Sequence, residues 1–242
     1  MPALAAAVCL TAIHLFAGRL RLLRAVPRSR WLSLAGGGSL AYTFVHLLPE
    51  LARSGIVRRQ AASVGPSDFV PYAVALAGLA IFYALEQLAA GELRNRGEDS
   101  LRPSTPVFWI HQSSFLGYSM LIGYLLVQRE IQGPWAFGTF LAAMSLHLFV
   151  NDHGLQEKYG SLYRRLSRFL LAGAVLAGWL LGELFPLGEP DLALPFSFLA
   201  GGAILNVIKE ELPGERRSRI LPFLLGAAVY ALVLIAGNLA GM

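Results

Sequence analysis

The sequence predicts an all-α integral membrane protein, and three observations support this prediction. Apolar residues make up 55% of the 242 residues and charged residues only 14%, whereas a soluble globular domain has about 25% charged residues. Mean hydropathy is +0.56. Eight stretches lack Asp, Glu, Lys and Arg, and most reach the span of about 17–25 residues that a membrane-crossing helix needs. A soluble enzyme is therefore excluded, and the single Cys9 excludes a disulfide framework.

The predicted spans follow these charge-poor stretches within one transmembrane domain over residues 1–242. They cover about residues 2–18, 31–50, 69–87, 105–128, 133–153, 167–186, 192–210 and 220–241. The first lacks the basic region that opens a signal peptide, and arginines follow it instead, as they follow an inserted helix. The sixth reaches span length only if Glu183 lies near the membrane surface.

The basic residues predict the orientation of the chain. The loops after spans 1, 3, 5 and 7 hold 16 of the 20 Lys and Arg residues, and such an excess marks cytoplasmic loops. Both termini are therefore expected outside the cytoplasm, in a bacterial inner membrane. Because the basic residues serve as topology signals, no nucleic-acid partner is expected; the expected partners are the lipid bilayer and a small solute. The sequence leaves open whether the chain acts alone or as a homodimer.

Two spans resemble each other. Residues 35–38 read AGGG and precede LLPE at 47–50, and residues 200–203 read AGGA and precede ELP at 211–213. Since these helices are predicted to cross in opposite directions, spans 1–3 and 6–8 are expected to be inverted repeats around spans 4 and 5. The result is a 3+2+3 arrangement, and inverted repeats are common in secondary transporters, where the substrate site lies near the midplane at the repeat interface. The alternative is that small residues simply permit close helix packing.

Polar residues inside the hydrocarbon indicate a site. His111, Ser114 and Tyr118 share a face of span 4, and His147 and Asn151 share a face of span 5. At about 1.5 Å per residue, His111 and His147 lie within a few ångströms of the same depth. Neutral imidazole is the commonest metal ligand, so we expect the two rings to share one cation. The alternative is that each ring hydrogen-bonds a neighbouring helix and nothing else.

The chain also resembles the ZIP family of divalent metal transporters, in motifs spread over nearly its whole length. Residues 42–50 (YTFVHLLPE) are similar to the end of that family's second helix, residues 84–88 (ALEQL) to the end of its third, and residues 198–213 to its seventh. The resemblance implies eight spans with both termini outside and a metal site on helices 4 and 5.

The same resemblance implies which residues bind the metal. His111 and His147 stand at histidine positions of the family motifs, Asn151 at a ligand position and Asp152 at the next acid, whereas Phe115 and Leu148 replace acidic residues. The implied metal ligands are therefore His111, His147, Asn151 and Asp152, holding a single ion. A second set is expected to line the path: Gln112, Ser114, Tyr118, His46 and Glu211.

The expected function is transmembrane transport of a divalent cation such as Zn²⁺, which would be the substrate and not a required cofactor. The alternative is a transport-incompetent relative that keeps the fold as a binding or scaffolding module. A third hypothesis is an intramembrane hydrolase with a metal-bound water at His111, His147 and Asp152. Because no nucleophile or oxyanion motif accompanies those residues, we do not expect an enzyme.

Overall fold

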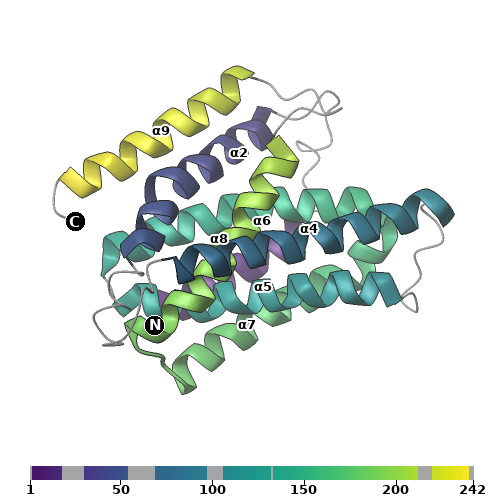
Figure 1. Cartoon of the computed structure of the whole chain (residues 1–242), viewed down its shortest axis with the longest axis horizontal. Coiled ribbons are helices and arrows are strands. Elements are labelled where there is room, and N and C mark those ends of the chain that lie inside the picture. Colours follow the sequence, from purple (N-terminus) through teal and green to yellow (C-terminus); the bar gives the residue numbers. More distant parts are fainter. Residues whose placement is uncertain are drawn as a thin grey trace.

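The computed structural model describes residues 2–17, 30–53, 69–96, 106–131, 133–211 and 220–239. Within these ranges every regular element is helical. The helices are α1 (Pro2–Phe16), α2 (Arg30–Tyr42), α4 (Val70–Arg96), α5 (Pro106–Ile131), α6 (Pro134–Leu162), α7 (Arg168–Leu184), α8 (Glu189–Glu211) and α9 (Ile220–Leu239), with π-helical turns η3 (Thr43–Leu47) and η5 (Tyr163–Ser167) (Figure 1). The predicted span ends at 18, 105 and 240–241 lie outside the described residues.

Each of the eight predicted stretches contains a helix. Three described segments are long and apolar enough to cross a membrane, namely Val70–Leu88, Pro134–Leu184 and Ile220–Leu239. Pro2–Phe16 and Asp191–Asn206 are shorter apolar helices. The chain is thus an all-helical protein in its described part, with segments suited to a bilayer, while eight crossings remain a prediction.

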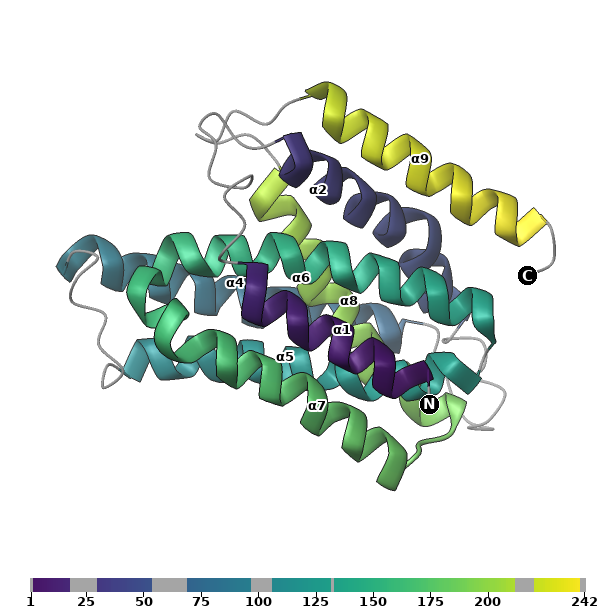
Figure 2. The ribbon, with the colours of Figure 1, turned by 180° about the vertical axis from the view of Figure 1, so that it is seen from behind.

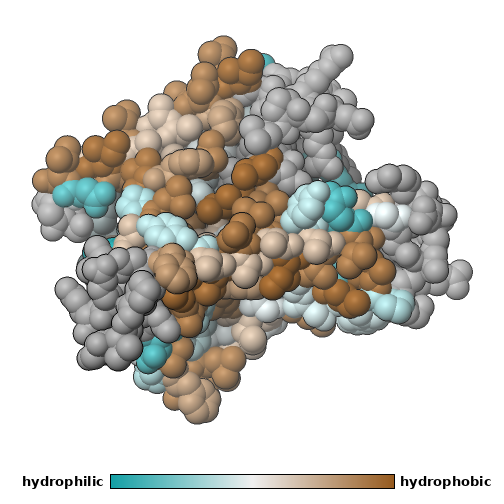
Figure 3. Space-filling model, in the orientation of Figure 1, coloured by the Kyte–Doolittle hydropathy of each residue, from teal (hydrophilic) through white to brown (hydrophobic). Residues whose placement is uncertain are grey.

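The surface is also suited to lipid. Large apolar side chains are exposed along α4 and α9, with Leu76 65%, Leu221 81% and Leu239 84% exposed. Figure 3 shows hydrophobic residues over much of the described part of one face. Such contiguous apolar surface marks contact with a partner or a membrane, and it agrees with the low charge of the sequence.

Helix α2 packs on α9 through two glycines, and the pair lies side by side in both Figure 1 and Figure 2. A side chain at Gly37 would collide with the backbone of Phe223 and Ala227, and one at Gly226 would collide with the backbone of Leu34. Small residues permit this close approach of two helices.

Helix α8 packs on α4 in the same register. A side chain at Gly201 would collide with the backbone of Ala75 and Leu79, and one at Gly78 with that of Phe198. The offsets are the same in both pairs. Gly37 and Gly201 each contact the residues at positions −3 and +1 relative to the glycine of the partner helix, which is Gly226 or Gly78. Gly226 and Gly78 each contact the residue three positions before Gly37 or Gly201. The same packing unit therefore occurs in both pairs, and it occurs a third time where Gly123 of α5 meets Gly178 of α7.

Helices α6 and α7 form an antiparallel hairpin, seen from behind in Figure 2. Gly160, near the end of α6, has φ 48° and ψ −112°, a conformation that residues with a side chain rarely adopt. The π-helical turn η5 follows directly and leads into α7. A kink at such a point in a helix has identifiable causes, here the glycine and the π-turn.

Candidate functional site

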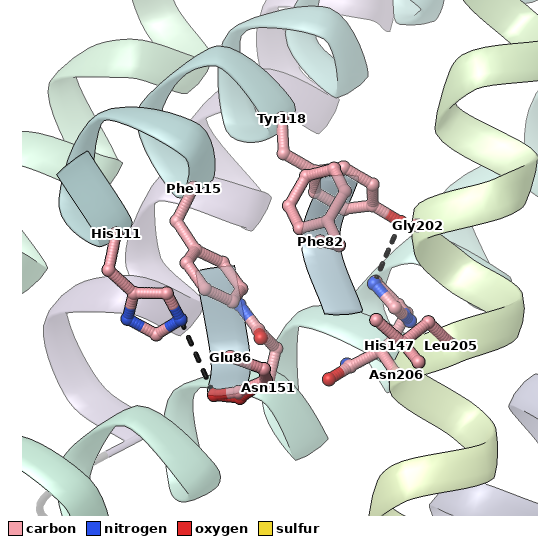
Figure 4. Close-up of a pocket in the computed structure, with 10 residues that line it drawn as sticks. All are labelled: Phe82, Glu86, His111, Phe115, Tyr118, His147, Asn151, Gly202, Leu205 and Asn206. Atoms are coloured by element: carbon pink, nitrogen blue, oxygen red, sulfur yellow. Dashed lines mark hydrogen bonds and ion pairs between the residues drawn. The ribbon is translucent and has the colours of Figure 1, made fainter. Parts of the chain in front are cut away.

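One pocket lies where α4, α5, α6 and α8 meet, with about 340 Å³ of space including its opening. Its walls combine polar and aromatic side chains from all four helices (Figure 4). The residues that line it are Phe82, Glu86, His111, Phe115, Tyr118, His147, Asn151, Gly202, Leu205 and Asn206.

His111 of α5 reaches a carboxylate on α4. Its Nε2 lies 3.4 Å from Oε1 of Glu86, and its Nδ1 lies 2.5 Å from the hydroxyl oxygen of Tyr159 on α6. A neutral imidazole has one N–H, so the tyrosine hydroxyl donates to Nδ1 when Nε2 carries the proton toward Glu86. Lys158 of α6 forms an ion pair with the same Glu86 oxygen. Three helices thus meet through one carboxylate.

His147 of α6 lies at the other side of the pocket (Figure 4). Its Nε2 is 2.9 Å from the hydroxyl oxygen of Tyr118 on α5, and both side chains are buried. Asn151, one turn further along α6, is 3% exposed, and within the described residues its Nδ2 has no hydrogen-bond partner. Buried amides normally have partners, and this N–H group is left without a protein acceptor; a cation would be bound by the side-chain oxygen of Asn151 instead.

The structure therefore brings together three of the four residues implied as metal ligands, namely His111, His147 and Asn151, together with Tyr118. The two imidazoles face one pocket from opposite sides, but each Nε2 already has a protein partner, Glu86 for one and Tyr118 for the other. A shared cation would have to displace both partners.

Asp152 does not line the pocket; it pairs with α1. Both its carboxylate oxygens lie 2.9 Å from Nδ1 of His14, and both side chains are completely buried. The hydroxyl of Tyr163 donates to the backbone oxygen of His14 at 3.3 Å. The sequence alone does not predict this pair, because spacing within α1 carries no information about α6.

Among the other residues expected to line the path, Gln112, Ser114 and His46 do not line the pocket. Gln112 is buried, and its amide has no hydrogen-bond partner within the described residues. Ser114 donates to its own helix at the His111 carbonyl, 2.7 Å away, as hydroxyls in helices often do. His46 lies in η3 and stacks on Tyr42, with ring centroids 5.0 Å apart. The side chain of Glu211 lies outside the described part of the structure.

Two polar residues of the pocket, Glu86 and Asn206, are not among the site residues predicted from the sequence. Glu86 ends a charge-free stretch, yet α4 continues to Arg96 and the carboxylate faces the pocket. Asn206, which lies inside a charge-free stretch, was not considered. The available signal was the general one that polar residues within apolar helices are functional candidates.

An aromatic wall replaces the acid that the family resemblance expects at Phe115. This ring packs on His111 with centroids 4.9 Å apart and on Phe82 with centroids 5.9 Å apart. Leu148, where the resemblance expects another acid, is fully buried and does not line the pocket. Only one of the two substituted positions therefore belongs to the pocket.

The chemistry available is that of a mixed nitrogen and oxygen site: two imidazoles, one carboxylate and the amides of Asn151 and Asn206. Within the described residues no three His, Cys, Asp or Glu side chains are gathered as a preformed metal cluster. Mixed donors of this kind suit a divalent cation of the zinc group once the side chains rearrange. A soft thiolate site is not available, since Cys9 lies exposed on α1.

Comparison with known proteins adds no assignment: no family model, curated protein or solved structure matches the chain. The class that the fold and the pocket define is an all-helical, membrane-compatible protein with a buried polar pocket at the meeting point of four helices.

Proposed function

We propose that this chain is an integral membrane transporter of a divalent cation, of ZIP type, with one reduced site. The observation that supports this most directly is the pocket itself, which gathers His111, His147, Glu86 and Asn151 from three helices inside an apolar protein. Buried polar groups in such surroundings are costly, and they mark ion and substrate paths.

The repeated glycine packing unit supports a transporter architecture. If α2 and α9 correspond to α8 and α4, spans 1–3 and 6–8 are inverted repeats, with α5 and α6 between them. The pocket then has one wall from each repeat, α4 and α8, and two walls from the central pair. Substrate sites of secondary transporters lie at such repeat interfaces, and movement of one repeat against the other gives alternating access without ATP.

Glu86 supplies the negative charge that the family resemblance expects from acids at positions 115 and 148. A site for a dication needs negative charge, and the Glu86 carboxylate supplies it from α4, beside His111. The proposed ligand set is therefore His111, His147, Glu86 and Asn151, without Asp152. We further propose eight crossings with both termini outside the cytoplasm, as the basic residues predict.

Metal uptake by cells or proteoliposomes tests the proposal. Wild-type protein should accumulate Zn²⁺, Fe²⁺ or Mn²⁺ above an empty vector, and His111→Ala combined with His147→Ala should abolish the uptake. His153→Ala is the matched control, because His153 pairs with Glu157 outside the pocket. No uptake of any of these metals by the wild type would end the proposal.

The alternative, a transport-incompetent binding or scaffolding module, is favoured by one observation: both imidazole Nε2 atoms are already engaged and an aromatic ring stands at position 115. In that case Phe115→Asp should create Zn²⁺ binding where the parent protein has none. Leu148→Glu should not, because position 148 is buried away from the pocket. Tight Zn²⁺ binding by the parent would exclude this alternative.

A further inference from the structure

The carboxylate of Glu86 in the pocket forms an ion pair with the ammonium group of Lys158. Lys158 pairs with Oε1 of Glu86, the same atom that faces Nε2 of His111. Both partners are largely buried, with Lys158 17% and Glu86 11% exposed. Lys158 lies on the face of α6 that also carries His147 and Asn151, since residues four and eleven positions apart recur on one side of a helix.

The lysine and a metal ion would compete for this carboxylate, of which Lys158 already takes Oε1. Both are cations, so a dication bound at Glu86 would repel the ammonium, and the interior screens that repulsion weakly. In the metal-free site the ammonium neutralises Glu86, as a buried carboxylate requires. Lys158 therefore has the charge sign and the position of the substrate itself.

The neighbouring residues link displacement of the lysine to the rest of the site. Tyr159, next in the chain, contacts Nδ1 of His111, so adjacent residues of α6 hold both Glu86 and His111. Gly160 follows with its positive φ, at the point where α6 departs from helical geometry. The segment that restrains the site therefore ends where α6 departs from helical geometry.

We infer that Lys158 is an internal substitute for the substrate cation: it neutralises Glu86 when the carrier is empty and is displaced when a divalent cation binds. This inference rests on the proposed transport function and names a further residue of its cycle. It explains how an empty site can reorient through the bilayer without an uncompensated carboxylate. It also makes Lys158 a determinant of affinity, because every binding event must break its ion pair.

Direct binding measurements on detergent-purified full-length protein test the inference, with Zn²⁺ and separately Mn²⁺ as probes. Lys158→Met should bind between about 5- and 150-fold more tightly than wild type, the range typical of coupled equilibria in proteins. Glu86→Gln should bind more weakly. Arg165→Met is the control, because Arg165 is an exposed basic residue in η5 and should leave the affinity unchanged.

The outcomes separate the two proposals. If wild type binds metal and Lys158→Met binds no more tightly, the role of Lys158 is refuted while the transport proposal stands. If neither wild type nor Lys158→Met binds either metal, both are refuted.

A measurement on the wild-type protein covers the case in which the variant fails to fold. Acylation of Lys158 by an amine-reactive reagent, followed by mass spectrometry, should increase when Zn²⁺ is added, because the ammonium leaves its buried partner. Labelling that Zn²⁺ leaves unchanged or lowers would refute the inference. Lys209, the one other lysine of the sequence, provides the internal reference within the same digest.

Discussion

The His14–Asp152 pair offers a quantitative test of the packing between α1 and α6. Both side chains are completely buried and joined at 2.9 Å. Removing one partner of a buried ionic or hydrogen-bonded pair costs about 3–5 kcal/mol, because the other is left without compensation. We therefore expect His14→Leu or Asp152→Leu to lower the free energy of unfolding by about that amount. For a chain of this size the same change lowers the Tm by about 6–20 °C.

The double variant makes the prediction specific. Replacing a buried pair by apolar residues is often close to neutral, so His14→Leu with Asp152→Leu should be less destabilised than either single variant. The assay is thermal or denaturant unfolding of the detergent-solubilised protein. His153→Leu is the control, since its partner Glu157 is 46% exposed and a carboxylate left in contact with water costs little, with exposed pairs worth about 0–1 kcal/mol. Equal losses for His14→Leu and His153→Leu, or additive losses in the double variant, would refute the reasoning.

Three further variants test other features of the structure. Gly201→Leu should lower the free energy of unfolding by about 1–3 kcal/mol in the same assay, because the backbone of α4 leaves no room for a side chain. Gly117→Ala is the control and should be neutral, because the space around Gly117 is open. Gly160→Ala should cost about 1–3 kcal/mol because of its backbone conformation, and no loss would contradict the kink. Tyr118→Phe should tighten Zn²⁺ binding by about 2–10-fold, since it frees Nε2 of His147 from a hydrogen bond of ordinary strength; weaker binding would indicate that the hydroxyl instead helps to hold the cation.

Helix positions could be predicted from the sequence because charged residues interrupt the apolar stretches, although α4 and α6 continue past those stretches to Arg96 and Leu162. The shared pocket of His111 and His147 also follows from simple counting of depth along two antiparallel helices. Both arguments use only the regular geometry of a helix.

The partners of those histidines could not be predicted in this way. Glu86 and Tyr159 reach His111 from α4 and α6, and such contacts depend on how helices far apart in the sequence are rotated about their axes. For Asp152, the family resemblance and the helical periodicity gave different predictions. Helical periodicity already turns it away from the face of His147 and Asn151, yet the family resemblance implied it as a ligand.

The contact between α5 and α7 has a consequence for how the pocket can change shape. Side chains at Gly123 and Gly178 would collide with the opposing helix backbone, so these two helices touch along their main chains. Sliding or tilting of α5 alone would break that contact, and α5 with His111 should therefore behave as a rigid unit with α7. The cavity can then widen only by movement of α4, α6 or α8 or by movement of α5 and α7 together. Spin-label distances from α5 to α4, α6, α7 and α8 would show which of these helices moves.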